Sequence, residues 1–183
     1  IVVQSGNDAT IVVAEGLAGS EDAFARLMTD KAREMGIMAT SFQNASGWPD
    51  PNHVTTVADL AILAQRLIED FPQYYGYYSE TEFTFSDITQ SNRNPLLYAG
   101  IGADGLKTGY TEAAGYGLAA SATEGDRRLI LVVNGFDSSQ ARASESQRIL
   151  EWGFREFDTY DLFAAGEPVS EAEVWLGNSA DLP

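Results

Sequence analysis

The segment GLKTGYTEAAGYGLAASATEGDRRLILVVNGF, Gly105 to Phe136, decides the fold class of this 183-residue chain. Its runs of β-branched, aromatic and small residues are typical of strands. The part that begins YGLAASATE reverses at Gly125 and Asp126, a two-residue connection typical of a β-hairpin. The preceding GLKTGYT is strand-like as well, so the segment predicts an antiparallel sheet.

Helical periodicity flanks this sheet on both sides. Four helices are expected, at Asp8–Gly19 with Asn7 or Asp8 as N-cap, Ser20–Gly36, Thr56–Pro72 and Ser138–Phe157. The stretch EFTFSDITQSN before the sheet is also strand-like. We therefore expect the α/β class in its α+β form, with helices packed on an antiparallel sheet over residues 1–157. After Asp158 the helical period is lost, which predicts a linker and the start of a C-terminal β domain over 158–183.

Composition excludes several classes of function. The net charge of −16 and the pI near 4.2 disfavour binding to nucleic acid or to anionic lipid, because both attract basic surfaces. The chain has no cysteine, so disulfides and thiolate metal sites are impossible. It begins at Ile1 without the pattern of a signal peptide, which predicts a processed or truncated chain.

The glycine-rich GIGADGLKT imitates two nucleotide-binding motifs. Gly100, Gly102 and Gly105 form a literal G-x-G-x-x-G, and Lys107 nearly completes a P-loop. Leu106 interrupts the P-loop spacing, however, and both motifs need a helix directly downstream to receive the phosphates. The glycines that follow predict no helix there. The segment is therefore interpreted as a loop that enters a strand.

Familiar catalytic sets are excluded by counting. His53 is the only histidine, so a multi-histidine metal site cannot form, and no serine has the G-x-S-x-G environment of a nucleophile elbow. His53 lies in the segment PDPNHVTT and is expected to be a loop or surface residue. We predict no metal and no cofactor.

Two triplets remain, Ser5-Gly6-Asn7 before a helix and Lys107-Thr108-Gly109 in a strand. Together with S-x-x-K, such a pair is typical of penicillin-binding proteins and class A β-lactamases. The flanking phrases are QSGNDA, FQNASGWPDPNHVTTVADLAILAQRLI, NRNPLL, GLKTGYTEAAGYGLAASA and ARASESQRILEWGFREF. Because these phrases occur in this order, the chain resembles the serine-type D-alanyl-D-alanine carboxypeptidases, which are the low-molecular-mass penicillin-binding proteins. The resemblance covers most of Ile1–Phe157.

The resemblance implies a transpeptidase-like domain and an extracytoplasmic hydrolase. Such an enzyme removes the terminal D-alanine from peptidoglycan stem peptides through an acyl-enzyme, and it binds β-lactam antibiotics. In that reaction Ser5 would relay protons and Asn7 would orient the lysine of S-x-x-K. Lys107 would supply positive potential, and the backbone N–H of Tyr110 would help to bind the oxyanion.

The resemblance also implies three residues that bind substrate. Thr108 would donate a hydrogen bond to the terminal carboxylate, and Gly109 would leave room for the peptide to add to the strand edge. Arg142, in the phrase ARASES, would hold the same carboxylate. SGN stands where β-lactamases usually have SDN, and no E-x-x-L-N occurs, so a β-lactamase is the weaker alternative.

One element of the family pattern is absent from the chain. An S-x-x-K motif would need serine three residues before Lys31 or Lys107, and those positions hold Met28 and Asp104. The chain is therefore expected to be the C-terminal part of a catalytic domain, inactive alone, whose nucleophile lies in a missing N-terminal segment. That segment or a neighbouring copy would cover an open face of the sheet. The alternative is a noncatalytic peptidoglycan-binding homologue.

Overall fold

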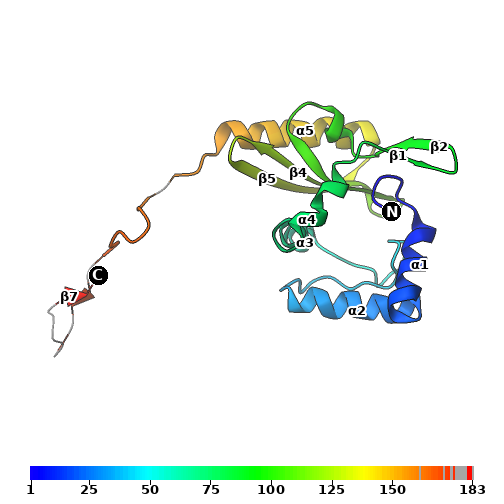
Figure 1. Cartoon of the computed structure of the whole chain (residues 1–183), viewed down its shortest axis with the longest axis horizontal. Helices are drawn as coiled ribbons and strands as arrows, with labels where there is room; N and C mark the ends of the chain where they lie inside the picture. The colour runs from blue at the N-terminus through cyan, green and yellow to red at the C-terminus, as the bar shows by residue number, and fades with distance from the viewer. Residues whose placement is uncertain (161, 171, 174, 176–180, 183) are drawn as a thin grey trace.

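The structure, a computed structural model, describes residues 1–160, 162–170, 172–173, 175 and 181–182. Its centre is an antiparallel sheet in the order β3-β4-β5, formed by Ala103–Thr111, Gly115–Glu124 and Arg127–Phe136 (Figure 1). The two-residue turn between β4 and β5 falls at Gly125 and Asp126, as the sequence predicts. Lys107 pairs with Ala119 and Thr108 with Leu118, so the KTG triplet lies on the edge strand β3.

Helices cover both faces of this sheet, which confirms the predicted α+β arrangement (Figure 1). On one face α5, Ser139–Glu156, packs Leu150 and Phe154 against Leu118 of β4 in a buried apolar cluster. On the other face α3, Val57–Asp70, packs Ala64 near Leu106. Burial of these apolar side chains is the main force that joins the layers.

A second pair of helices carries the SGN triplet. Helix α1, Asn7–Ala18, packs against α2, Glu21–Glu34. The predicted N-cap of α1 is wrong: Gly6 occupies that position, and Asn7 is the first helical residue. Ser5 adopts a left-handed φ of 57°, so the chain turns just before the N-cap Gly6, which has no side chain to cap the helix.

A connection built from short elements leads from α3 to β3. It contains α4 (Pro72–Tyr75), η1 (Gly76–Tyr78), the hairpin of β1 (Glu82–Phe85) with β2 (Ile88–Ser91), and η2 (Pro95–Tyr98). Asn94, which is 1% exposed, donates from Nδ2 to the Gly105 carbonyl at 2.8 Å and accepts from the Leu96 N–H at 3.1 Å. This side chain fixes the start of β3, two residues before Lys107.

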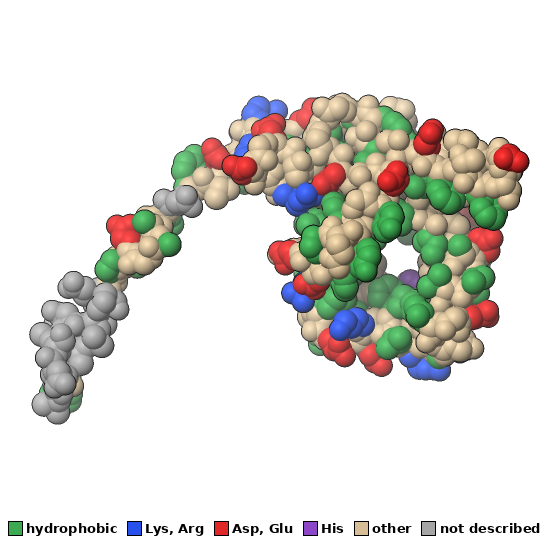
Figure 2. All heavy atoms as spheres, viewed as in Figure 1, with side chains coloured by type: hydrophobic (Ala, Val, Ile, Leu, Met, Phe, Trp, Pro, Cys, Tyr) green, Lys and Arg blue, Asp and Glu red, His purple; other side chains and the backbone are tan. Residues whose placement is uncertain are grey.

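An apolar groove of about 540 Å³ lies beside α3 and the sheet. Figure 2 shows hydrophobic side chains gathered around the hollow between α3 and α1. The groove is lined mostly by aliphatic residues, among them Ile1, Val2, Leu60, Leu63, Leu67, Leu106, Val132 and Val133. The chain therefore has an apolar groove next to β3. The identity of what covers this surface stays a prediction.

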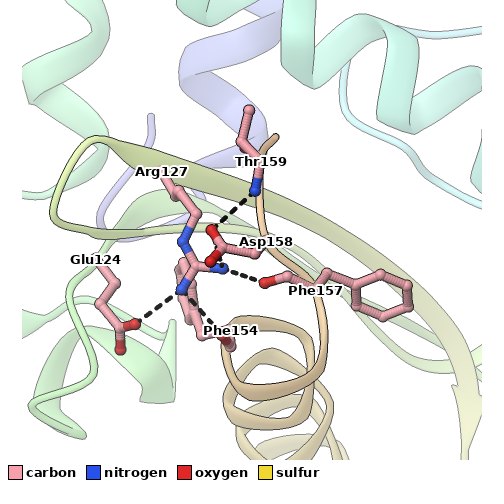
Figure 3. Close-up of polar contacts among 6 residues, drawn as sticks. All are labelled: Glu124, Arg127, Phe154, Phe157, Asp158 and Thr159. Atoms are coloured by element: carbon pink, nitrogen blue, oxygen red, sulfur yellow. Dashed lines mark hydrogen bonds and ion pairs between the residues drawn. The ribbon is translucent and has the colours of Figure 1, made fainter. Parts of the chain in front are cut away.

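Arg127 fixes the C-terminal end of α5 to the central sheet (Figure 3). Its guanidinium donates to the carbonyls of Phe157 and Phe154, the latter at 2.9 Å, and forms a 3.1 Å ion pair with Glu124. A cation beside the last carbonyls of a helix opposes the negative end of the helix dipole. Because Arg127 begins β5, this contact joins the C-terminal end of α5 to the sheet.

Beyond α5 the chain runs away from this body (Figure 1). Ala172–Glu173 (β6) pairs with Asp181–Leu182 (β7). Part of the predicted β domain lies outside the described residues, and the division at residue 158 stays a prediction. None of the described helices has both the length and the apolar character needed to cross a membrane.

Candidate active site

Lys107 and Ser5 form the centre of the site. Lys107 Nζ donates a hydrogen bond to Ser5 Oγ at 2.9 Å and another to the Thr108 carbonyl at 2.8 Å. The lysine comes from the edge strand β3, whereas the serine comes from the turn before α1. The left-handed backbone of Ser5 is rare for a residue with a side chain, and such strain is concentrated at functional sites.

A cleft of about 720 Å³ surrounds this pair. Six of the seven predicted site residues line it: Ser5, Asn7, Lys107, Thr108, Gly109 and Tyr110. The volume is in the range of small-molecule and peptide sites. The fold therefore brings the two triplets together around one cavity, although they lie at opposite ends of the sequence.

The ammonium group of Lys107 is electrostatically perturbed. Burial, followed by the positive charges of Arg93 and Arg142, lowers the pKa of Lys107 from 10.5 to about 8. Both arginines therefore act on the same site, since like charges disfavour the protonated lysine. An ammonium whose pKa lies this close to neutral pH is typical of a functional group.

The strand residues next to Lys107 leave space for an extended ligand. β3 is at the edge of its sheet, with β4 as its only strand partner among the described residues. A Cβ added to Gly109 would meet no atom within 4 Å, so the backbone is open there. Tyr110 is exposed and its ring lies 4.3 Å from that of Tyr116, centroid to centroid. This geometry permits a peptide to add as a further strand.

Arg142, the seventh predicted residue, does not line the cleft but lies near it on α5. Its side chain is 8% exposed, and its guanidinium carbon is 5.6 Å from the centroid of the Tyr116 ring. Burial lowers the pKa of Arg142, while Tyr116 acts in the opposite direction. Within the described part of the chain, Arg142 has no hydrogen bond and no ion pair from its guanidinium, and Nε is buried without a partner.

The sequence analysis missed the opposite wall of the cleft. Residues 45–49 line it together with β3, and they include the 68% exposed Trp48. Asn44 fixes this loop: its Oδ1 accepts from the N–H groups of Gly47 and Trp48, and its Nδ2 donates to the Trp48 carbonyl. An exposed tryptophan in the turn sequence SGWPD was the available signal. Arg93 was missed too, although it lies in the phrase NRNPLL.

His53 has no part in the cleft lining. It lies in a loop as expected, where Nδ1 accepts from the Gln43 N–H at 3.3 Å and the ring packs edge-on against Phe42. Burial lowers the pKa of His53. In the described residues, no cluster of three or more histidine or carboxylate side chains is placed to hold a metal ion.

Comparisons with known proteins agree with this geometry. The sequence pattern of the D-alanyl-D-alanine carboxypeptidase family, Peptidase_S11, matches residues 1–138. The D-alanyl-D-alanine carboxypeptidase DacC of Escherichia coli K12 is 42% identical over the whole chain, which covers 46% of that protein. The crystal structure of penicillin-binding protein 5 from Haemophilus influenzae superposes with a TM-score of 0.88 at 41% identity, covering 98% of this chain and 53% of that one.

Penicillin-binding protein D2 from Listeria monocytogenes, solved in a cefotaxime-bound form, gives a TM-score of 0.77 at 30% identity. The superposition covers 84% of this chain and 63% of the Listeria protein chain. Fold and site thus define a domain of the penicillin-binding-protein type. The chain belongs to the D-alanyl-D-alanine carboxypeptidase family. It spans about half the length of the curated relatives it matches.

Proposed function

We propose that the protein containing this chain is an extracytoplasmic serine-type carboxypeptidase. It removes the terminal D-alanine from peptidoglycan stem peptides through an acyl-enzyme, and β-lactams acylate the same site. The observation that carries this proposal is the 2.9 Å contact between the half-buried Lys107 ammonium and Ser5 Oγ, inside a cleft bordered by an open strand edge. Family membership and the drug-bound Listeria relative support it.

The polar residues of the cleft match the needs of acyl transfer. The reaction requires a route for the proton between nucleophile and leaving amine, and positive potential near the developing negative charge. Ser5 Oγ, in contact with an ammonium, can pass a proton to the leaving group. The charge of Lys107 stabilises negative charge on the substrate. Asn7, which lines the cleft, can orient the base and bind the substrate amide.

The substrate would lie along β3. Its backbone would pair with the free edge at Gly109, and Tyr110 N–H would be one oxyanion donor. The terminal carboxylate would then lie near Thr108 and Arg142. A buried arginine without a carboxylate partner is costly, because a charge taken out of water needs compensation. An anionic ligand would supply that compensation for Arg142.

The nucleophile is placed in a part of the protein outside residues 1–183, since no S-x-x-K occurs here. The apolar groove supports this placement because Lys107, Thr108 and Gly109 line both the groove and the cleft. A segment that buries apolar residues in the groove would therefore also present side chains beside Lys107. This missing segment is the proposed intramolecular partner of the chain.

Mass spectrometry with labelled penicillin tests the proposal. The whole protein should gain one covalent adduct and release D-alanine from peptides ending in D-Ala-D-Ala, whereas residues 1–183 alone should gain none. An adduct on residues 1–183 would place the nucleophile in this chain and contradict our assignment. No adduct and no D-alanine release from the whole protein would instead favour a noncatalytic homologue. Rapid loss of the adduct with turnover of penicillin would favour a β-lactamase.

A further inference from the structure

Arg142 is held by an aromatic ring and by no acid. Its guanidinium carbon lies 5.6 Å from the Tyr116 ring centroid, within the range of a cation–π contact. None of the ion pairs in the described chain includes Arg142, and Nε is unpartnered. Ser146, one helical turn further along α5, is fully buried, and its Oγ also has no partner. The polar donors of this arginine are therefore uncommitted.

Tyr116 is itself fixed from several sides. It pairs with Tyr110 of β3 and with Phe136 of β5. Glycines flank it, and a Cβ at Gly115 or Gly117 would approach neighbouring atoms of β5 to 2.9 Å and 2.6 Å. A side chain at Gly115 would therefore collide with the β5 backbone, and one at Gly117 would collide with the side chain of Asn134. The ring of Tyr116 contacts both the ring of Tyr110, near the end of β3, and the guanidinium of Arg142 on α5.

An aromatic support has a specific chemical consequence. A carboxylate would hold an arginine through its N–H donors and would then compete with any anionic ligand. A ring face attracts the cation through its quadrupole and leaves the N–H groups in the guanidinium plane free. An aromatic ring therefore restricts the arginine side chain without neutralising its charge or occupying its N–H donors.

We infer that Tyr116 is the positioning residue of the site, holding the Arg142 guanidinium on its ring so that its N–H donors stay available to the ligand's terminal carboxylate. This inference rests on the proposed function for the identity of the ligand. It adds a substrate-selecting contact that spans three elements: β3 through Tyr110, β4 through Tyr116 and α5 through Arg142.

Kinetics in the whole protein test the inference with a series of variants. Tyr116→Phe keeps the ring and should retain near-normal kcat/KM on a peptide ending in D-Ala-D-Ala. Tyr116→Leu and Tyr116→Met remove the ring face and should lower kcat/KM about 3- to 30-fold, mainly through KM. On the same peptide with an amidated C-terminus, the substitutions should change kcat/KM little, because that peptide lacks the carboxylate. Tyr77→Leu, at an exposed tyrosine outside the cleft lining, is the matched control.

A double-mutant cycle separates positioning from general packing. When Arg142 has already been replaced by alanine, Tyr116→Leu should lower kcat/KM little further, because the guanidinium that Tyr116 positions is absent. Equal losses on the free and amidated peptides, or full additivity of the two substitutions, would overturn the inference. So would a Tyr116→Phe variant as impaired as Tyr116→Leu.

Side-chain NMR supplies a readout that does not need turnover. The Arg142 Nε–H signal should shift on titration with N-acetyl-D-alanine and not with its amide, and the apparent Kd should rise several-fold in Tyr116→Leu. An Nε–H response that is unchanged by loss of the ring, or absent in the unaltered protein, would overturn the inference. If the response is seen but no D-alanine is released from peptides, the proposed function fails while the anion-holding role of the pair stands.

Discussion

Lys107 Nζ lies 2.9 Å from Ser5 Oγ, although 102 positions of sequence separate the two residues. One partner is on an edge strand, and the other is in a strained turn at the start of a helix. The contact puts a positive charge of lowered pKa against the hydroxyl that would carry a proton during acyl transfer. The following predictions concern the whole protein unless stated otherwise.

Loss of the Lys107 charge should slow acylation strongly. We expect Lys107→Ala to lower the rate of acylation by labelled penicillin on the order of a hundredfold or more, the usual cost of removing one preorganised electrostatic group. Lys31→Ala is the matched control, because Lys31 is the other lysine of the chain and makes an exposed ion pair with Glu34. Near-normal acylation in Lys107→Ala would refute the role of this residue.

The pH dependence of the reaction should report the same ammonium. With a pKa of about 8, Lys107 is charged below that pH and neutral above it, so kcat/KM should fall as the pH rises through about 8. Lys107→Arg should move this alkaline limb to higher pH, because a guanidinium stays protonated throughout the range. A limb that stays near 8 in Lys107→Arg would assign the titration to another group.

Arg142 should discriminate between substrate and antibiotic. We expect Arg142→Ala to lower kcat/KM on D-Ala-D-Ala peptides roughly 10- to 150-fold, the equivalent of one charged hydrogen bond. Acylation by penicillin should suffer less, since its carboxylate can also contact Thr108 and Lys107. Arg148→Ala, an exposed arginine on the same helix, is the control. Equal losses in both assays would count against a substrate-specific role.

The loop 45–49, which forms the wall of the cleft opposite β3, should contribute to substrate binding more than to the rate of the reaction. Trp48 lines the cleft, and its large exposed ring can be covered by a bound peptide. Trp48→Ala should raise KM about three- to tenfold with little change in kcat, the pattern of lost uniform binding. Trp175→Ala, a 91% exposed tryptophan outside the cleft lining, should leave both constants unchanged. A fall in kcat at constant KM would instead place Trp48 in the reaction itself.

Asn94 should support the fold that carries the site. Asn94→Ala leaves the Gly105 carbonyl and the Leu96 N–H without their partner, so the free energy of unfolding should fall by about 2 kcal/mol or more. Urea unfolding measures this value, with the exposed Asn52→Ala as control, expected to change it by less than about 0.5 kcal/mol. A loss as small as that of the control would show that the contact adds nothing to stability.

Much of the architecture could be predicted because its signals are local. The two-residue turn at Gly125 and Asp126 depends on neighbouring residues only, and it appears where expected. The helix predicted over Ser138–Phe157 is present as α5, Ser139–Glu156, with Ser138 as its N-cap. The N-cap of α1 could not be placed, because the left-handed Ser5 moves the start of the helix and no local rule anticipates that conformation.

The sequence by itself determined the residue types of the site, because the SGN and KTG triplets and their order are written in the chain. Only the tertiary structure decided that Lys107 meets Ser5, that Trp48 forms the facing wall, and that Arg142 is buried on Tyr116 with its donors free. Distances, burial and pKa depend on side chains that are remote in sequence and are brought together by the packing of apolar surfaces. No local sequence pattern identifies those neighbouring side chains.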